Sequence, residues 1–253
     1  MGTLSKALNI MLAMEDAHQF KHLGQELHLI FIDMEKAYDK VKHAFLWATL
    51  SQMNFPDAFL DFLKKLYDES TIQIITFYGL TDPVVLYTGI RQGCPLSCLL
   101  FNLYMEHFIR TLKKDHKGYA FFNNKLLHLV CQAFADDLVI MANSREEVIS
   151  IFQTMIQKAD ELEMKINFEK CRYSHIAKNP YDMDLKIGSI TIKGVSQDMA
   201  FKYLGVRLSE ALQGDENVKL AMANAHKHLQ SLKNSGLPLD LKAKVLNATA
   251  IPA

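Results

Sequence analysis

The chain has 253 residues, 49% of them hydrophobic and 22% charged, a balance that is typical of a folded globular protein and excludes a disordered or fibrous one. Lys and Arg number 28 and Asp and Glu also 28, so the chain lacks the basic excess that is usual in nucleic-acid-binding proteins. Its four cysteines have no zinc-binding spacing, and no apolar run approaches the roughly 18 residues of a membrane span, so we expect a soluble, intracellular protein of the nucleus or cytoplasm that is neither secreted nor membrane-bound.

The first half of the chain predicts one buried strand among helices. Apolar residues recur at helical spacing from Leu4 to Lys21, and Gly24 ends this helix. The segment from Leu27 to Ile32 is short, apolar and partly β-branched, which predicts a buried strand that ends next to Asp33. Further along, we expect helices at 41–53 and 57–67, a β-hairpin that pairs 71–78 with 83–88, and a helix from about 95 to 114.

The second half contains a predicted hairpin with acidic residues at its tip. Two apolar runs, 126–134 and 138–142, flank Asp136 and Asp137. A helix is expected at 146–163, followed by two or three short strands within 165–206 and by helices within 218–249. This order of elements predicts an α+β fold with a small, mostly antiparallel sheet backed by helices.

Three carboxylates, Asp33, Asp136 and Asp137, stand at the ends of apolar strands. An ionised carboxylate beside a hydrophobic core is costly unless it is paired or binds a cation. Ions such as Mg²⁺ prefer oxygen ligands, and two of them about 3.5–4 Å apart can activate an attacking oxygen and stabilise a leaving one. Taken singly, each of these residues is more often part of a turn or a helix cap, so the spacing alone does not decide between the two interpretations.

Five segments in chain order resemble the catalytic motifs of reverse transcriptases, in the form found in non-LTR (LINE-type) retrotransposons and group II introns. They read FIDMEKAYDKV at 31–41, GIRQGCPLS at 89–97, FADD at 134–137, INFEKC at 166–171 and FKYLG at 201–205. One such motif would be a weak signal, but five in family order indicate the family. The resemblance implies a polymerase palm at 25–210, preceded at 1–24 by a helix from the junction with the fingers and followed at 211–253 by a truncated helical segment.

The same resemblance implies a metal site and a residue for the leaving group. Asp33 and Asp136 would bridge two Mg²⁺ ions, with Mn²⁺ as an alternative, and Asp137 would be the more peripheral ligand. The backbone carbonyl of Met34 would help to hold the nucleotide-bound ion. Lys170 would protonate or neutralise the pyrophosphate, although an ordinary surface lysine is the alternative.

Further residues would bind the nucleotide and the primer. Tyr38 matches the aromatic gate that lies under the deoxyribose and excludes a 2′-hydroxyl, with a core aromatic as the alternative. Gln92 and Gly93 match residues that pack on the incoming nucleotide, where glycine lets the backbone approach closely. Arg91 either contacts the template or a phosphate, or is a solvated charge. The primer grip would consist of Lys202, Tyr203, Leu204 and Gly205.

The implied activity is RNA-directed DNA polymerisation, in which deoxynucleoside triphosphates (dNTPs) are added to a primer 3′-hydroxyl by two-metal nucleotidyl transfer. The implied partners are an RNA template, a DNA primer and dNTPs. We expect an incomplete fragment that lacks the fingers and thumb segments of a parent polyprotein. A catalytically inactive relic or an RNA-binding module is the alternative, which the neutral charge favours. A two-metal nuclease is disfavoured because Tyr38 and Gln92 would have no role in it.

Overall fold

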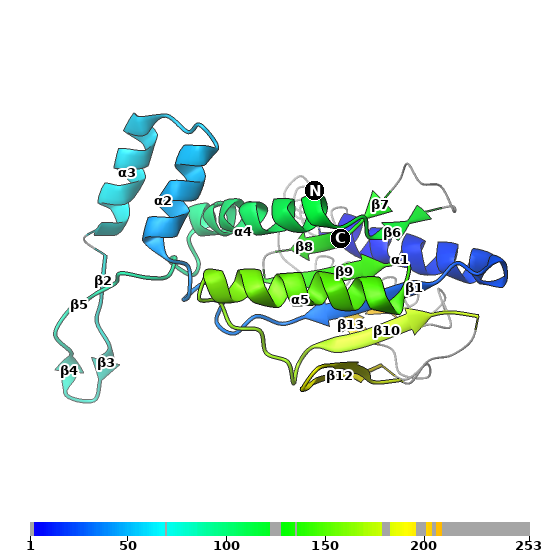
Figure 1. The fold of residues 1–253 in the computed structure, drawn as a ribbon. Coiled ribbons are helices and arrows are strands. Elements are labelled where there is room, and N and C mark those ends of the chain that lie inside the picture. The colour runs from blue at the N-terminus through cyan, green and yellow to red at the C-terminus, as the bar shows by residue number, and fades with distance from the viewer. Residues whose placement is uncertain are drawn as a thin grey trace, which may run out of the picture.

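A six-stranded sheet forms the centre of the protein (Figure 1). Its spatial order is β11 (Leu185–Ile187), β12 (Ile190–Gly194), β10 (Arg172–Ile176), β1 (Leu27–Ile32), β9 (Asp137–Ala142) and β8 (Cys131–Phe134). Neighbouring strands are antiparallel except for the parallel pair β10 and β12, which confirms the mostly antiparallel sheet. This computed structural model describes residues 3–68, 70–121, 128–134, 136–178, 183–195, 201–203 and 206–208.

Helices cover both faces of the sheet (Figure 1). α4 (Pro95–Asp115) and α5 (Arg145–Glu161) pack on one face, and α1 (Thr3–Phe20), which continues into a short 3-10 helix (Lys21–Leu23), packs on the other. α2 (His43–Gln52) and α3 (Asp57–Asp68) stand beside the sheet as a pair. The predicted helices of this part of the chain are confirmed. Within the described ranges, every helix is too short or too polar to span a membrane.

β1 is buried along its whole length, and its side chains alternate between the two faces of the sheet. Leu27, Leu29 and Phe31 belong to the core on the α1 side, whereas Ile30 and Ile32 belong to the core under α4 and α5. Alternation with a period of two residues is the property of an extended chain. Because both faces are covered, the strand reads as a continuous apolar run, and this is why its bounds could be predicted from the sequence.

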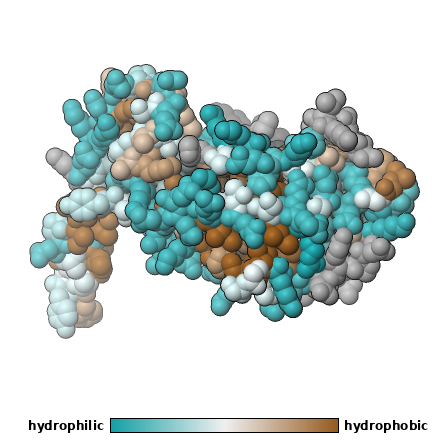
Figure 2. Space-filling model, viewed as in Figure 1, coloured by the Kyte–Doolittle hydropathy of each residue, from teal (hydrophilic) through white to brown (hydrophobic). Residues whose placement is uncertain are grey.

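The arm at residues 71–88 differs from the predicted hairpin. β2 (Thr71–Ile72) pairs with β5 (Val84–Val85), and β3 (Ile75–Thr76) pairs with β4 (Gly79–Leu80). The turn therefore falls at Phe77 and Tyr78, and the prediction that placed it between 79 and 83 was wrong. The Thr76 hydroxyl closes this turn by donating to the Gly79 carbonyl at 2.7 Å, and Gly79 adopts φ +115°, which favours glycine. Figure 2 shows apolar side chains on the surface of the arm, where Ile75 is 85% exposed.

Short strands are more numerous than the sequence predicts. The expected strand at 126–134 is divided, because β7 (His128–Leu129) pairs with the unpredicted β6 (Tyr119–Ala120) while β8 belongs to the main sheet. Besides β10, β11 and β12, the described residues contain β13 (Phe201–Tyr203) and β14 (Val206–Leu208), so the expectation of two or three strands was too low. Such short strands have too few positions to show an alternation. The helices predicted within 218–249 lie outside the described residues.

Three buried rings stack across β1 and β10. The ring centroids of His28, Tyr173 and His175 lie 5.4 to 6.0 Å apart, and Nδ1 of His28 is hydrogen-bonded to the Tyr173 hydroxyl at 2.6 Å. Burial, with the charges of His28 and Arg145, lowers the pKa of His175 to about 4. Burial also lowers the pKa of His28. The folded protein therefore keeps these imidazoles neutral at pH values where the unfolded chain would be protonated.

We predict that the free energy of unfolding falls as the pH drops from about 6.5 to about 4. In this window the unfolded chain binds a proton at residue 175 that the folded protein excludes, so stability falls by at most about 1.4 kcal/mol per pH unit for this group. Urea unfolding should show a shallower fall for His175→Gln than for the wild type. His22→Gln, which changes an exposed histidine, should keep the wild-type slope. Equal slopes in all three proteins would contradict this account.

Candidate active site

The register between β1 and β9 brings the acidic residues to one end of the sheet. Ile32, the last residue of β1, pairs with Leu138 of β9. One step further along the same register, Asp33 comes opposite Asp137, the first residue of β9. Asp136 lies in the turn between β8 and β9. The predicted hairpin with carboxylates at its tip is confirmed, and the pairing of β1 adds Asp33 to it.

The three carboxylates interact electrostatically. Burial and the charges of Asp136 and Asp33 raise the pKa of Asp137. Among the residues that the structure describes, no three His, Cys, Asp or Glu side chains are already arranged as a metal site. The donor set nevertheless fits a hard divalent cation, because carboxylate oxygens are its preferred ligands and a positive charge would relieve the repulsion at Asp137.

Met34 forms an isolated antiparallel bridge with Ile166 directly after Asp33. The hydrogen bonds of this bridge belong to the neighbouring residues. The Asn167 N–H donates to the Asp33 carbonyl at 2.9 Å, and the Glu35 N–H donates to the Lys165 carbonyl at 2.8 Å. In a pair of this type the two central residues turn their own N–H and C=O groups away from each other. The carbonyl of Met34 is therefore not used by the bridge.

Lys170 lies on the other side of Asp33. The turn that contains Lys170 leads from the Met34–Ile166 bridge into β10, where Arg172 pairs with Phe31. The Lys170 Nζ lies 3.5 Å from Asp33 Oδ2, with 67% and 42% of the two side chains exposed. An exposed ion pair of this kind contributes little to stability. The structure thus puts a cationic side chain at the carboxylate end of the sheet, while its role in chemistry stays a prediction.

Tyr38 lies in the turn after Asp33 and packs against α4. Its ring is stacked on Phe101 with centroids 4.6 Å apart and an interplanar angle of 10°. Phe101 is fully buried, whereas Tyr38 is only partly buried and packs on the core from outside. Burial, the hydrogen bond with the Cys98 thiol and the charge of Asp136 raise the pKa of Tyr38 to about 12. The phenol is therefore neutral at ordinary pH and lies within electrostatic range of the carboxylates.

The segment at 89–97, a loop that continues into the first residues of α4, is docked onto the turn that contains Tyr38. The Ile90 N–H donates to the Tyr38 carbonyl at 3.0 Å, and the imidazole of His43 is hydrogen-bonded through Nε2 to the Gly89 carbonyl at 2.7 Å. Gly89 has φ +90°, and a Cβ there would come within 3.3 Å of the Cα and carbonyl oxygen of Asp39. Both the dihedral angle and the close backbone approach require glycine at this position.

Gln92 and Gly93 follow on the exposed side of this loop. The Gln92 amide donates to Asp39 Oδ1 at 3.2 Å, so it is tied to the same turn as Tyr38. Gly93 has φ +83°, but no atom lies within 4 Å of the position where a Cβ would stand. In the structure, then, glycine is needed at residue 93 for its backbone conformation, and the contact with a nucleotide stays a prediction.

Arg91 has a structural role that the sequence did not predict. Its guanidinium donates to the Ser70 hydroxyl at 2.7 Å and to the Leu66 carbonyl at 3.2 Å, and it lies 5.9 Å from the centroid of the Tyr67 ring. These groups belong to the end of α3 and the residues just after it. Arg91 therefore joins the loop at 89–97 to α3 while it is still exposed to solvent, and its contact with the template or a phosphate stays a prediction.

Only part of the predicted primer grip can be located. Lys202 and Tyr203 lie on β13, which pairs with β14. Leu204 and Gly205 lie outside the described residues. The primer grip stays a prediction.

Three residues of the site were missed from the sequence: His43, Phe101 and Asn167. Asn167 lies within the motif at 166–171 and could have been found there. No sequence signal distinguishes Phe101 from the other buried residues of its helix, such as Phe108. His43 acts through a contact with a residue 46 positions away, which only the tertiary structure reveals.

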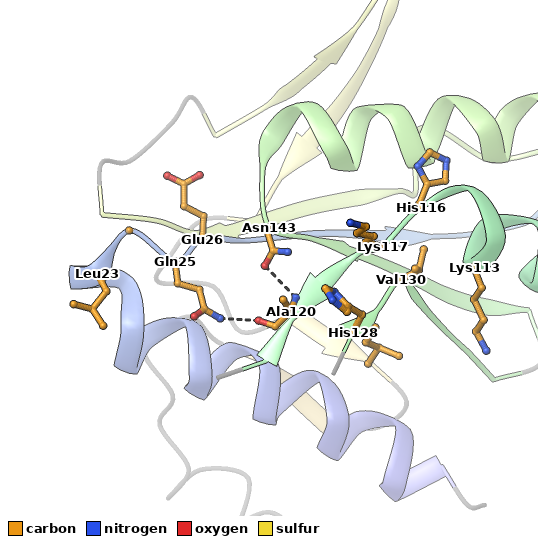
Figure 3. Close-up of a pocket in the computed structure, with 12 residues that line it drawn as sticks. Leu23, Gln25, Glu26, Lys113, His116, Lys117, Ala120, His128, Val130 and Asn143 are labelled. Atoms are coloured by element: carbon orange, nitrogen blue, oxygen red, sulfur yellow. Dashed lines mark hydrogen bonds between the residues drawn. The ribbon is translucent and has the colours of Figure 1, made fainter. Parts of the chain in front are cut away.

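A cavity of about 950 Å³ lies at the other end of the sheet (Figure 3). Gln25 and Glu26, which precede β1, form part of its wall, together with Lys117 after α4. The Gln25 amide donates to the Ala120 carbonyl at 2.9 Å, and Asn143 accepts from the Ala120 N–H at 3.1 Å. Since Asp33 follows the opposite end of β1, the cavity is separated from the carboxylates by the length of the strand, roughly 20 Å. It is not part of the candidate active site.

The family model described as reverse transcriptase (RNA-dependent DNA polymerase) matches residues 3–208. The chain is 28% identical over 204 residues to the transposon TX1 uncharacterized 149 kDa protein of Xenopus laevis, covering 79% of this chain and 15% of that protein. It is 27% identical over 202 residues to the retrovirus-related Pol polyprotein from type-2 retrotransposable element R2DM of Drosophila melanogaster, covering 76% and 18%. The chain thus spans less than a fifth of the length of these two relatives.

The fold is also found in a solved structure, that of apo telomerase from Candida tropicalis truncated from its C-terminal domain. The TM-score is 0.53 at 12% sequence identity, and the match covers 75% of this chain and 38% of that one. At so low an identity, the likeness concerns the fold alone.

We predict that Gly89→Ala destabilises the protein by about 1–3 kcal/mol, because it adds backbone strain and a close contact with Asp39. Gly188→Ala is the matched control: Gly188 also has a positive φ, +59°, but nothing lies within 4 Å of its Cβ position. In the control, the free energy of unfolding should fall only by the cost of placing alanine in the left-handed conformation, about 1 kcal/mol. Urea unfolding measures both changes. A loss in Gly89→Ala no larger than that of the control would show that the contact with Asp39 is unimportant.

Proposed function

We propose that this chain, which belongs to the reverse transcriptase family, forms the palm of an RNA-directed DNA polymerase. In this function it would add deoxynucleotides to a primer 3′-hydroxyl on an RNA template. The observation that carries the proposal is the meeting of Asp33 with the turn between β8 and β9. Two separate parts of the chain converge there on one acidic end of the sheet. A folded domain tolerates such repelling charges where function needs them.

The side chains that would hold divalent cations are Asp33, Asp136 and Asp137, with the carbonyl of Met34 as a further oxygen donor. Mg²⁺ fits these ligands, and Mn²⁺ is the alternative. When bound, two such ions would lower the pKa of the primer 3′-hydroxyl and neutralise the triphosphate. The protein itself needs to supply position and charge and does little covalent chemistry.

Other residues would orient the substrates around these carboxylates. The exposed part of Tyr38 would lie under the sugar of the dNTP, and Gln92 and Gly93 would pack on the nucleotide. Lys170 is within reach of the same end of the sheet through its ion pair with Asp33, where its charge would balance the departing pyrophosphate. Lys202 and its neighbours in the primer grip would contact the primer backbone.

RNA template, DNA primer and further segments of a longer polyprotein are the proposed partners. The neutral charge of the chain supports the last of these, because the basic surface that nucleic acid requires would then come from outside it. The second candidate function is RNA binding without catalysis. It is favoured by one observation, that the chain spans less than a fifth of the length of two of its relatives, so that the other parts of a polymerase of that length would lie outside it.

Extension of a DNA primer on an RNA template, with Mg²⁺ and dNTPs, tests the proposal. Asp136→Asn should lower the rate by roughly 10²-fold or more, because a group that stabilises charge in the transition state is removed. Asp61→Asn, which changes an exposed carboxylate on α3, should leave the rate unaltered. Extension that persists in Asp136→Asn would overturn the proposal. Salt-dependent RNA binding by a wild-type chain that does not extend the primer would favour the second candidate.

A further inference from the structure

The ring of Tyr38 is held in place from α4. Its plane lies 10° from that of Phe101, with the centroids 4.6 Å apart, so the two rings are stacked face to face. Phe101 is fully buried and cannot move without disturbing the core. A flat, rigid surface under one face of a partly exposed ring restricts the tilt of that ring.

The other contacts of Tyr38 agree with this restriction. Its carbonyl accepts from the Ile90 N–H at 3.0 Å, which ties its backbone to the loop at 89–97. Its hydroxyl is near enough to Cys98, one turn before Phe101 on α4, for the thiol to raise the pKa of the phenol. The backbone and the ring face of Tyr38 are therefore held by two different groups.

The next aromatic residue of α4 has a different environment. Tyr104 makes an edge contact with Phe45, with centroids 5.3 Å apart and an interplanar angle of 72°, and both lie within or against the main core. Phe108, further along the helix, is also part of this core. Phe101 is therefore the aromatic residue of α4 that connects the core to Tyr38 and so to the candidate active site.

We infer that Phe101 is a positioning residue, which holds the ring of Tyr38 and so sets the preference for deoxyribonucleotides over ribonucleotides. The inference rests on the proposed function, in which Tyr38 lies under the sugar. The 2′-hydroxyl of a ribonucleotide is excluded only if the ring that obstructs it cannot move away, even by a fraction of an ångström. Without the flat face of Phe101, the Tyr38 ring gains that freedom while its own atoms are unaltered.

Primer extension with dNTPs and with ribonucleoside triphosphates gives the selectivity, as the ratio of the two kcat/KM values. Phe101→Leu should lower this ratio by about 10-fold or more, because the steric difference between the sugars is a single hydroxyl. Phe108→Leu is the matched control, since it removes an equally buried ring about two turns further along the same helix. The ratio of the two kcat/KM values in Phe108→Leu should equal that of the wild type, although urea unfolding should show that Phe101→Leu and Phe108→Leu are both less stable. Phe101→Met serves as a second variant that fills more of the volume.

A second measurement does not depend on catalysis. With ¹³C-labelled tyrosine, the NMR signals of Tyr38 are identified by their loss in Tyr38→Phe. The order parameter of the Tyr38 ring should fall in Phe101→Leu and Phe101→Met and stay at the wild-type value in Phe108→Leu. An unaltered order parameter in the Phe101 variants, or an unaltered selectivity ratio, would overturn the inference. A wild-type chain without any extension would overturn the proposed function instead, and the order parameters would still decide whether Phe101 positions Tyr38.

Discussion

The pairing of β1 with β9 and β10 is the constraint on which the rest of the site depends. β1 is buried on both faces, and its alternate side chains enter two different cores, so the hydrophobic effect selects one register with each neighbour. A slip of one residue would exchange the two faces and separate Asp33 from both Asp137 and Lys170. The acidic end of the sheet is therefore held together by apolar residues that lie outside it.

This arrangement explains how like charges can lie close together in a stable domain. The repulsion is visible in the raised pKa of Asp137. The cost is small compared with the burial of a whole central strand, and it is reduced further because Asp33 and Asp136 remain accessible to water. Without a bound cation, water can screen the repulsion between the carboxylates. A divalent cation would neutralise their charge more completely.

A second set of contacts supports the turn after Asp33. The loop at 89–97 approaches this turn backbone to backbone at Gly89, and it is joined to α2 by His43 and to α3 by Arg91. On the other side, α4 presents Phe101 to Tyr38. Residues from four separate parts of the chain thus determine the position of one short turn, and the side chains on that turn are better ordered than side chains on an unsupported loop would be.

The fold is common to proteins with little sequence in common. At 12% identity, the structure of the Candida tropicalis telomerase has the same architecture over most of this chain. A fold defined by apolar periodicity and strand register tolerates such divergence, because many apolar residues satisfy the same pattern. The few residues that the pattern does not explain, such as Gly89 and the three aspartates, are those for which a specific geometry or charge is required.

The sequence by itself determined the bounds of β1, the helices of the described part, the α+β class and the family. Each of these follows from a local signal: an apolar run, a helical period or a motif of adjacent residues. The short strands and the turn of the arm were misjudged, because two or three residues carry no periodic signal. Only the tertiary structure decided that Arg91 joins α3, that His43 holds Gly89 and that Phe101 supports Tyr38. These contacts join residues that are 21 to 63 positions apart in the sequence. The register of the sheet and the packing of α4 bring them together, and a local sequence pattern contains neither.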